Sequence, residues 1–171
     1  LKVIKEFQDY DLDVAVRIAQ CYADQKRIWP AYTIYKHVYT DFPDHKLAEQ
    51  CRFSAFALLL GEQEWEMAVE EGYAYVDLYP NGQYTEDVTL NLMQVHMQNG
   101  EMDKAMAMGT KALELFPAHR YIDQIKYLMG YIQFTKMEYA KALELFTEVV
   151  EQWPNSIYAE AADYWQAMSF L

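Results

Sequence analysis

Apolar residues recur at three- and four-residue steps along most of the chain, and the segment 125–154 shows the pattern most clearly. One apolar stripe runs through residues 125–132, a second runs through residues 139–150, and the polar pair Thr135-Lys136 separates them. Stripes with this period are typical of amphipathic α-helices. The pattern therefore predicts two short helices joined by a tight turn, here named helix A and helix B, and Pro154 ends the second one.

The same pattern returns every 37 residues along the chain. Four prolines mark the period: Pro43, Pro80, Pro117 and Pro154. An alanine stands twelve residues before each proline, and an aromatic residue stands directly before it: Ala31, Ala68, Ala105 and Ala142, then Phe42, Tyr79, Phe116 and Trp153. A fixed period of this length indicates units that bury their apolar faces by stacking on their neighbours. It predicts an all-α solenoid of helix-turn-helix repeats.

Four residues of the last full repeat carry a resemblance to a known family. Gly130, Ala142, Phe146 and Pro154 match the pattern of the tetratricopeptide repeat, or TPR, in which a small residue of helix A precedes this alanine, aromatic and proline. The resemblance covers essentially the whole chain and implies a right-handed α-α superhelix, a TPR-like solenoid. Its period is 37 residues, where the family usually has about 34. Such lengthened units resemble bacterial cell-envelope TPR proteins, including lipoproteins of outer-membrane protein assembly and the Tol-Pal accessory factor.

The period also predicts how the chain is organised. We expect a single TPR-like solenoid over residues 1–171. Residues 1–8 read as the end of a preceding helix B, complete repeats are expected at 10–43, 47–80, 84–117 and 121–154, and residues 157–171 read as a further helix A. Because neither end has the polar element that normally caps a solenoid, we expect a piece of a longer array.

Within a repeat, two sites sixteen residues apart exchange a large and a small side chain. The pairs are Ala19 with Tyr35, Phe56 with Gly72, Met93 with Gly109, and Gly130 with Phe146. Because protein interiors are densely packed, one large and one small residue fill such a contact, and two large ones would overpack it. We therefore predict that Phe56 lies over Gly72 and that Met93 lies over Gly109.

Charge and composition narrow the classes of function. A formal net charge of −12 repels phosphates and argues against nucleic-acid binding. The longest apolar run, residues 55–60, is far shorter than the roughly 20 residues that cross a bilayer, so we expect no membrane insertion by this segment. Cys21 and Cys51 read as small core residues. The resemblance implies a periplasmic or envelope-associated location, while the sequence itself leaves a cytoplasmic one open.

No pattern of catalytic or metal-binding residues emerges. The chain has no glycine-rich phosphate loop, no His-Glu-x-x-His and no Gly-x-Ser-x-Gly. We interpret the four histidines as residues on a helix surface or between adjacent repeats: His37, His45, His96 and His119. The clustered carboxylates read as solvated faces or turns: Glu62, Glu64, Glu66, Glu70 and Glu71. We expect a protein that is not an enzyme, with no catalytic residue, cofactor or metal site.

The candidate binding residues lie on the helix A face that turns away from helix B. A four-then-three spacing selects three positions per repeat: Val16, Gln20, Ala23; Phe53, Ala57, Leu60; Leu90, Gln94, Met97; Tyr127, Tyr131, Phe134; Tyr164, Met168, Leu171. In the TPR family this face is the concave groove. The expected partner-binding residues are Phe53, Leu90, Gln94, Met97, Tyr127, Tyr131, Phe134, Tyr164 and Met168. The alternative is that the stripe is buried against the next repeat.

These observations predict a non-enzymatic protein–protein interaction scaffold that binds a peptide or protein partner on the concave helix A face. Aromatic and methionine side chains supply contact area for an apolar ligand, and the acidic surroundings favour basic flanks on it. Two alternatives remain open. The chain is a structural spacer or a module that self-associates through uncapped ends, or it is the non-catalytic part of a larger enzyme.

Overall fold

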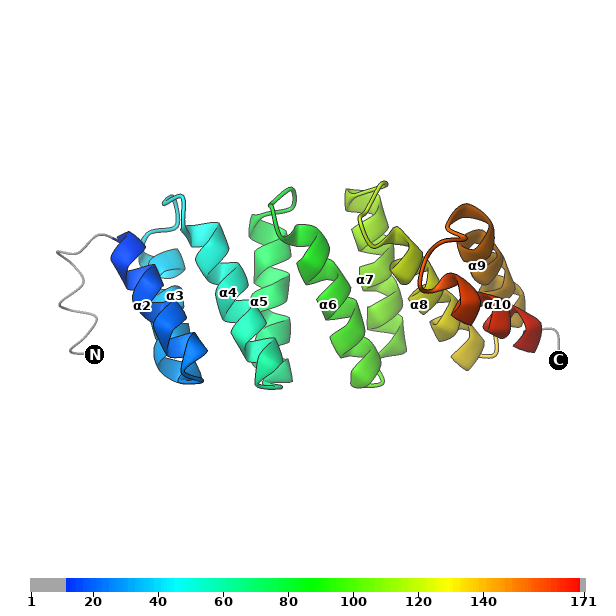
Figure 1. The fold of residues 1–171 in the computed structure, drawn as a ribbon, viewed down its shortest axis with the longest axis horizontal. Helices are drawn as coiled ribbons and strands as arrows, with labels where there is room; N and C mark the ends of the chain where they lie inside the picture. Colours follow the sequence, from blue (N-terminus) through cyan, green and yellow to red (C-terminus); the bar gives the residue numbers. More distant parts are fainter. Residues whose placement is uncertain (1–11, 170–171) are drawn as a thin grey trace. The chain divides into compact units, whose positions relative to one another are not determined.

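The computed structural model describes residues 12–169, and every regular element in that range is an α-helix. Figure 1 shows nine such helices: α2 (Leu12–Asp24), α3 (Ile28–Asp41), α4 (Ala48–Gly61), α5 (Trp65–Leu78), α6 (Thr85–Gln98), α7 (Met102–Leu115), α8 (Ile122–Thr135), α9 (Tyr139–Gln152) and α10 (Ala159–Met168). The predicted all-α fold of short paired helices is confirmed. No helix in the described range is long and apolar enough to cross a membrane. The predicted helix end at residues 1–8 lies outside that range, as does Leu171.

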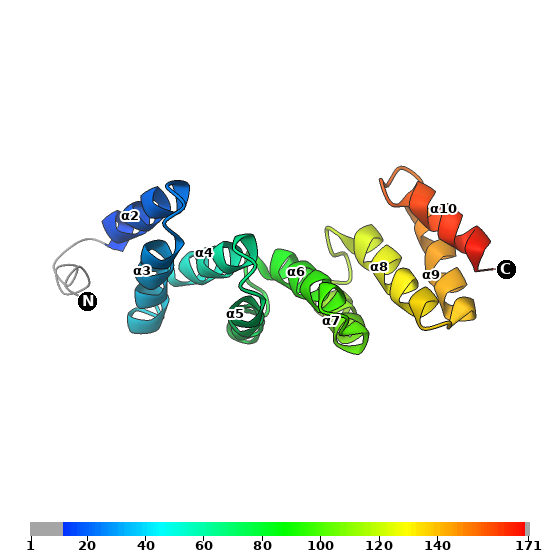
Figure 2. The same cartoon turned by 90° about the horizontal axis from the view of Figure 1, so that it is seen from below.

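The helices form two compact units. Unit 1 ends at Val88 and unit 2 begins at Thr89, so α6 starts in the first and continues in the second. In unit 1, α3 packs on both α2 and α4, and α5 packs on α4. In unit 2, α8 packs on α7 and α9, and α9 packs on α10. Within each unit, then, a helix contacts its own partner and the adjoining helix of the next repeat, as Figures 1 and 2 show.

Helix bounds recur with the sequence period. Each helix B has 14 residues, and these helices start at Ile28, Trp65, Met102 and Tyr139. Three helices A also have 14 residues and start at Ala48, Thr85 and Ile122. Because the starts within each set are 37 residues apart, any residue can be compared directly with its counterpart one or two repeats along the chain.

The turn from helix A to helix B places one residue in the left-handed region. That residue is Lys26, Gln63, Gly100 or Met137, with φ between 57° and 74°. Its N–H donates to the carbonyl three residues back, and the following N–H donates to the carbonyl five residues back. This pair of bonds satisfies carbonyls at the end of helix A, and the left-handed residue is what permits it. Glycine takes that place in the third repeat alone among these four turns.

The turn from helix B to the next helix A is built from two successive backbone hydrogen bonds. The N–H of His45, Gly82, His119 or Ser156 donates to the carbonyl of the aromatic residue before the proline. The residue that donates this bond also accepts one. Its carbonyl receives the first N–H of the next helix, which belongs to Ala48, Thr85, Ile122 or Ala159. The aromatic-proline pair therefore starts a turn of fixed length, and each helix A begins five residues after its proline.

A side chain completes that turn in each repeat. His45 Nδ1 accepts the N–H of Leu47, His119 Nδ1 accepts that of Tyr121, and Ser156 Oγ accepts that of Tyr158. Gly82 has no such atom, and the Tyr75 hydroxyl accepts the N–H of Tyr84 instead, at 3.1 Å. Tyr75 is itself held by Glu49, whose Oε1 also accepts the N–H of Gln83. A Cβ on Gly82 would lie 2.5 Å from that carboxylate oxygen and 2.8 Å from Tyr79 Cβ, so a larger residue would force this turn to shift.

The core confirms the predicted exchange of side-chain size at Gly109 and Gly130. A Cβ on Gly109 would lie 3.2 Å from Met93 Sδ, and one on Gly130 would lie 2.7 Å from Phe146 Cε1. Met93 and Phe146 therefore lie over their glycines. Phe56 and Gly72 are both buried, so Gly72 does not face solvent.

Two expectations about polar side chains are wrong, those for Cys21 and Glu71. Cys21 is exposed, while Cys51 is buried as expected. Of the two placements expected for the histidines, His96 and His119 do not take the helix surface, because both are buried; His96 bonds Glu101, and His119 lies near Thr89 of the preceding helix A. Glu71 is not solvated: its side chain is 11% exposed, because two tyrosines and an arginine bind it.

Candidate partner-binding site

A hollow of about 330 Å³ lies in unit 1 between the first two helices A. Helix α2 contributes Gln20, Ala23 and Asp24, α4 contributes Phe53, Ser54, Ala57 and Leu58, and α3 contributes Tyr35. Four of these residues, Gln20, Ala23, Phe53 and Ala57, belong to the helix A stripe. The hollow exists because the facing positions carry small residues, which leave space between adjoining helices.

Aromatic residues hold the walls of this hollow in place. The ring of Phe53 stacks on Tyr84, with centroids 4.1 Å apart and an interplanar angle of 5°. Tyr35 is 3% exposed, and burial, with a smaller effect of Cys51, raises the pKa of its hydroxyl to about 12. Because Tyr35 is neutral below that pH, Asp24 is the charged residue among those that line the hollow. The arrangement suits an apolar side chain with a cationic neighbour.

The aromatic stripe of unit 2 is used for packing between repeats. Tyr127 stacks on Tyr158 at 5.3 Å, and both Tyr131 and Phe134 contact the ring of Trp165, at 5.3 and 4.9 Å. The three stripe residues are half-buried, and they pack on a core that includes Phe146 and Ala162. In these three positions the side chains contact α10 and the turn before it.

The remaining predicted residues differ widely in exposure. Leu90 is buried, at 7% exposed, while Gln94 and Met97 on α6 and Met168 on α10 are half-buried. Tyr164 is 59% exposed and packs edge-on against Trp165 at 5.4 Å. The structure thus brings Phe53 into the hollow of unit 1 and gathers Tyr127, Tyr131, Phe134 and Tyr164 around α10.

Sequence reasoning missed the tyrosine that precedes helix A. Phe53 stacks on Tyr84 and Tyr127 stacks on Tyr158, and these two pairs are counterparts two repeats apart. The signal was available, because Tyr84, Tyr121 and Tyr158 recur with the period of 37 residues. Tyr35 and Trp165 were also missed as site residues; neither recurs at that period, so only the folded chain places them.

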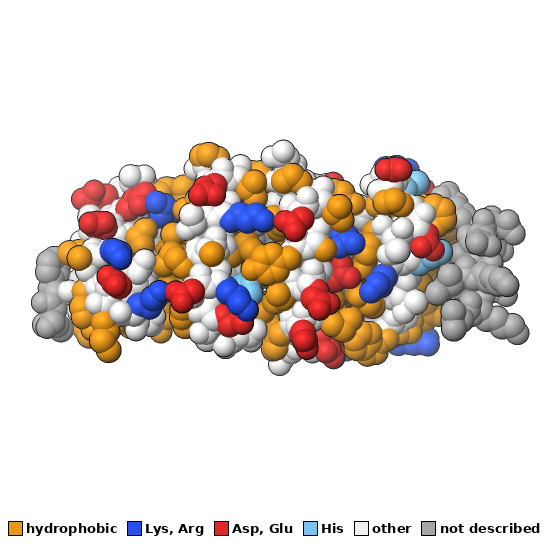
Figure 3. Space-filling view, turned by 180° about the vertical axis from the view of Figure 1, so that it is seen from behind, with side chains coloured by type: hydrophobic (Ala, Val, Ile, Leu, Met, Phe, Trp, Pro, Cys, Tyr) orange, Lys and Arg blue, Asp and Glu red, His pale blue; other side chains and the backbone are white. Residues whose placement is uncertain are grey.

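Electrostatics and donor geometry complete the description of these surfaces. In Figure 3, acidic side chains are scattered among hydrophobic and basic ones on the face shown, not gathered in one patch. Among the described residues, no three His, Cys, Asp or Glu side chains lie close enough together to hold a metal ion. The net charge of −12 therefore acts as a diffuse field over the surface.

Paired helices of constant length, a left-handed turn and an aromatic-proline stop define a TPR-like helical repeat. Residues 53–171 match the sequence model of the family YfiO, outer membrane lipoprotein. That match covers more than half of the chain, and the chain belongs to this family. No curated protein matches the sequence.

Solved structures show the same fold. A tetratricopeptide repeat protein from Parabacteroides merdae is 14% identical, with a TM-score of 0.77 over 92% of this chain and 59% of that one. MamA from Desulfovibrio magneticus is 19% identical, with a TM-score of 0.65 over 91% and 85%. A Podosopora anserina protein with nearly identical TPR-like repeats is 13% identical, with a TM-score of 0.66 over 93% and 84%. At such identities the likeness shows the fold.

Proposed function

We propose that the chain is a non-enzymatic interaction scaffold of the bacterial cell envelope, which binds a peptide or protein segment on its helix A face. The observation that carries this proposal is the hollow of unit 1, lined by four stripe residues that the sequence pattern selects. Membership of an outer membrane lipoprotein family supports the location. TPR-like folds act mostly through protein partners, which supports the class of function.

The chemistry of the hollow specifies its ligand. Phe53 and Tyr35 offer aromatic surface, and Ala23 and Ala57 leave room for an inserted side chain. Asp24 lies at the same hollow, and the net charge of −12 favours approach of a cation. The partner is therefore an apolar segment with lysine or arginine beside it. The chain itself does not bind nucleic acid, because its negative charge repels the phosphate backbone.

Unit 2 offers a second part of the same stripe. Tyr164 is exposed and Trp165 supports its ring, so this pair presents an aromatic surface. We assign Tyr131, Phe134 and Met168 a supporting role there, because Tyr131 and Phe134 contact Trp165 and Met168 is half-buried on the same helix. The proposal extends to Leu90, Gln94 and Met97 through their position on the stripe.

A charge placed in the hollow tests the proposal. Ala57 is exposed at the hollow, so Ala57→Arg should leave the fold intact, occupy the space and repel a cationic flank. We expect it to weaken binding of lysine-flanked aromatic peptides about tenfold, or about 1.4 kcal/mol. Fluorescence anisotropy with labelled peptides measures the change, and circular dichroism checks the fold.

The matched control is Ala107→Arg, the same change at an exposed alanine of α7. It adds the same charge on unit 2 and should leave affinity within about twofold, since solvent and salt screen an exposed charge that does not line the hollow. Equal weakening by both variants would show a general charge effect and contradict the proposed site. Absence of binding to every peptide, with the fold intact, would favour a structural spacer.

A further inference from the structure

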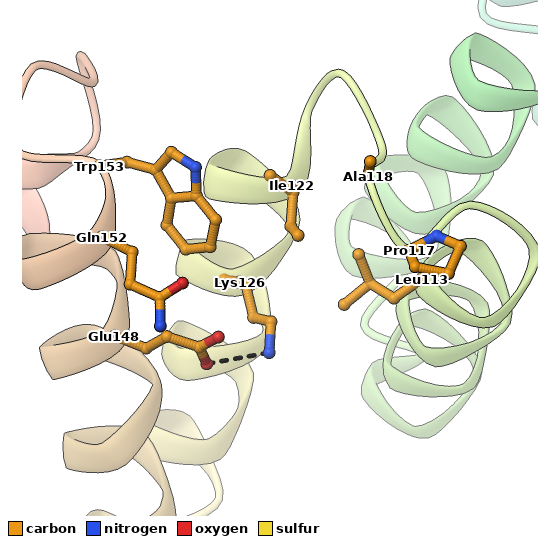
Figure 4. Close-up of a pocket in the computed structure, with 8 residues that line it drawn as sticks. All are labelled: Leu113, Pro117, Ala118, Ile122, Lys126, Glu148, Gln152 and Trp153. Atoms are coloured by element: carbon orange, nitrogen blue, oxygen red, sulfur yellow. Dashed lines mark hydrogen bonds and ion pairs between the residues drawn. The ribbon is translucent and has the colours of Figure 1, made fainter.

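A second groove, of about 670 Å³, lies in unit 2 among the ends of α7, α8 and α9 (Figure 4). Leu113 and Pro117 line one side, Ile122 and Lys126 of α8 line the middle, and Glu148 and Trp153 line the other side. None of these residues belongs to the helix A stripe. The groove is therefore separate from the site proposed above.

Unit 1 contains a direct counterpart of this groove. The bounds of α3, α4 and α5 recur as those of α7, α8 and α9 after two periods of 37 residues, which is 74 positions. Leu113 corresponds to Tyr39, Lys126 to Arg52, and Trp153 to Tyr79. Because the two sets of helices have equal lengths within one chain, the same framework carries different side chains at these positions.

In unit 1 the aromatic ring of Tyr39 occupies the position that corresponds to Leu113. Tyr39 is 5% exposed, and the guanidinium carbon of Arg52 lies 4.3 Å from the centre of its ring. The Tyr39 hydroxyl donates to Glu71 Oε1 at 2.6 Å, and Arg52 Nη1 donates to Glu71 Oε2 at 3.1 Å. A cation over the ring face and a carboxylate at the hydroxyl thus hold the ring.

In unit 2 the Tyr39 ring and the Glu71 carboxylate have no counterparts, but the cation remains and pairs with a different carboxylate, Glu148. The counterpart of Tyr39 is the shorter Leu113, and that of Glu71 is Leu145, whose side chain accepts no hydrogen bond. Lys126 keeps the positive charge, with its Nζ 2.9 Å from Glu148 Oε2. Figure 4 shows open space between Lys126 and Leu113. The groove therefore lies where the shorter Leu113 stands in the position of the Tyr39 ring of unit 1.

We propose that this groove accepts a phenylalanine side chain from a partner protein, in the position that the Tyr39 ring takes in unit 1. The ring face lies against the Lys126 ammonium group, and Leu113, Ile122 and Trp153 supply apolar contact. Because Leu145 replaces the carboxylate that receives the tyrosine hydroxyl, a phenyl ring suits the site better than a phenol. Binding here adds a contact point independent of the helix A face.

The test uses N-acetyl-L-phenylalaninamide as the probe and N-acetyl-L-leucinamide as its aliphatic comparison. Titration of the ¹⁵N-labelled full chain should shift the amide signals of Leu113 and Lys126 and the indole signal of Trp153. We expect the phenylalanine probe to bind about threefold more tightly, the contribution of one exposed cation–π contact. Equal affinity of the two probes, or shifts confined to the hollow of unit 1, would overturn the proposal.

Leu113→Tyr refills the groove from within, as Tyr39 does in unit 1, and should abolish these shifts. Glu114→Tyr places the same ring one residue along α7, at an exposed position, and should retain them. If Leu113→Tyr does not fold, Lys126→Met should weaken probe binding about threefold while Lys126→Arg preserves it. Unchanged binding in Leu113→Tyr, or equal binding in Lys126→Met and Lys126→Arg, refutes the assignment.

Discussion

Glycines in this chain differ in what surrounds them, and that difference decides what alanine does at each. Gly130 and Gly109 both lie under a large side chain, but Phe146 is rigid and Met93 is flexible. Helix propensity alone favours alanine over glycine by about 1 kcal/mol. The cost of crowding works against that gain and depends on how far the covering side chain can move.

We predict that Gly130→Ala lowers the free energy of unfolding by about 2 kcal/mol, because a Cβ only 2.7 Å from Phe146 Cε1 overpacks a buried ring. Gly109→Ala should be close to neutral, because Met93 moves aside while helix propensity improves. Urea unfolding followed by circular dichroism measures both. A larger loss for Gly109→Ala than for Gly130→Ala would contradict this account of the packing.

The turn between helix A and helix B shows strain at the level of the element. Three of the four turns place a residue other than glycine at positive φ. A left-handed conformation costs such residues about 1 kcal/mol or more, and glycine avoids that cost. The turns hold this conformation because two backbone hydrogen bonds and the following helix fix the chain.

Gly100→Ala and Gly61→Ala separate backbone strain from crowding. A Cβ added to either glycine would meet no neighbouring atom within 4 Å, but Gly100 has φ of +74° and Gly61 lies within α4. We predict that Gly100→Ala lowers the melting temperature, at a cost of about 1 kcal/mol, and that Gly61→Ala raises it slightly. Calorimetry of the two variants decides. A fall of similar size in both would rule out φ as the cause.

At the element level, much of the fold was predictable. The proline period and the apolar stripes predict helices A and B because propensity, patterning and the stop signal agree. The turns were harder, since Lys26, Gln63 and Met137 are poor signals for a left-handed residue. Their conformation comes from the two backbone hydrogen bonds that close helix A, and no local preference announces it.

The binding site was less predictable from sequence than the helices were. The stripe positions that line the hollow could be identified, because a helix has a fixed angular spacing. Sequence could not predict that Trp165 and Tyr158 pack over the aromatic part of the stripe. That contact depends on rotamers and on packing between repeats. The groove beside Lys126 could not be predicted either. It results from the absence of an aromatic ring at Leu113 and of a carboxylate at Leu145.

At the scale of the whole molecule, the two units differ in how their ionisable groups are buried. Burial raises the pKa of Cys51 to about 12, and burial with hydrogen bonds to Glu71 and Glu49 raises the pKa of Tyr39 and Tyr75. All of these groups, and Tyr35, lie in unit 1. Each is neutral in the folded chain and ionises more readily when unfolded, at about pH 9 for cysteine and 10 for tyrosine.

Alkaline pH should therefore unfold unit 1 before unit 2. The stabilisation is fully present below pH 9 and is lost as the pH rises from there toward 12, because the unfolded state releases protons first. Trp65 reports on unit 1 and Trp165 on unit 2. Fluorescence of single-tryptophan variants across about pH 8 to 12 should show the earlier transition at Trp65. Coincident transitions would contradict the prediction.

The turn after each proline has a consequence for how such a chain grows. Its geometry needs one aromatic-proline pair and one acceptor atom, which histidine, serine or a neighbouring tyrosine supplies. A duplicated repeat therefore includes the residues that form its own turn. The new copy can connect to the next helix A without further substitutions. The remaining residues of each copy are then free to diverge, which is how one duplicate can hold a tyrosine ring where another leaves room for a partner.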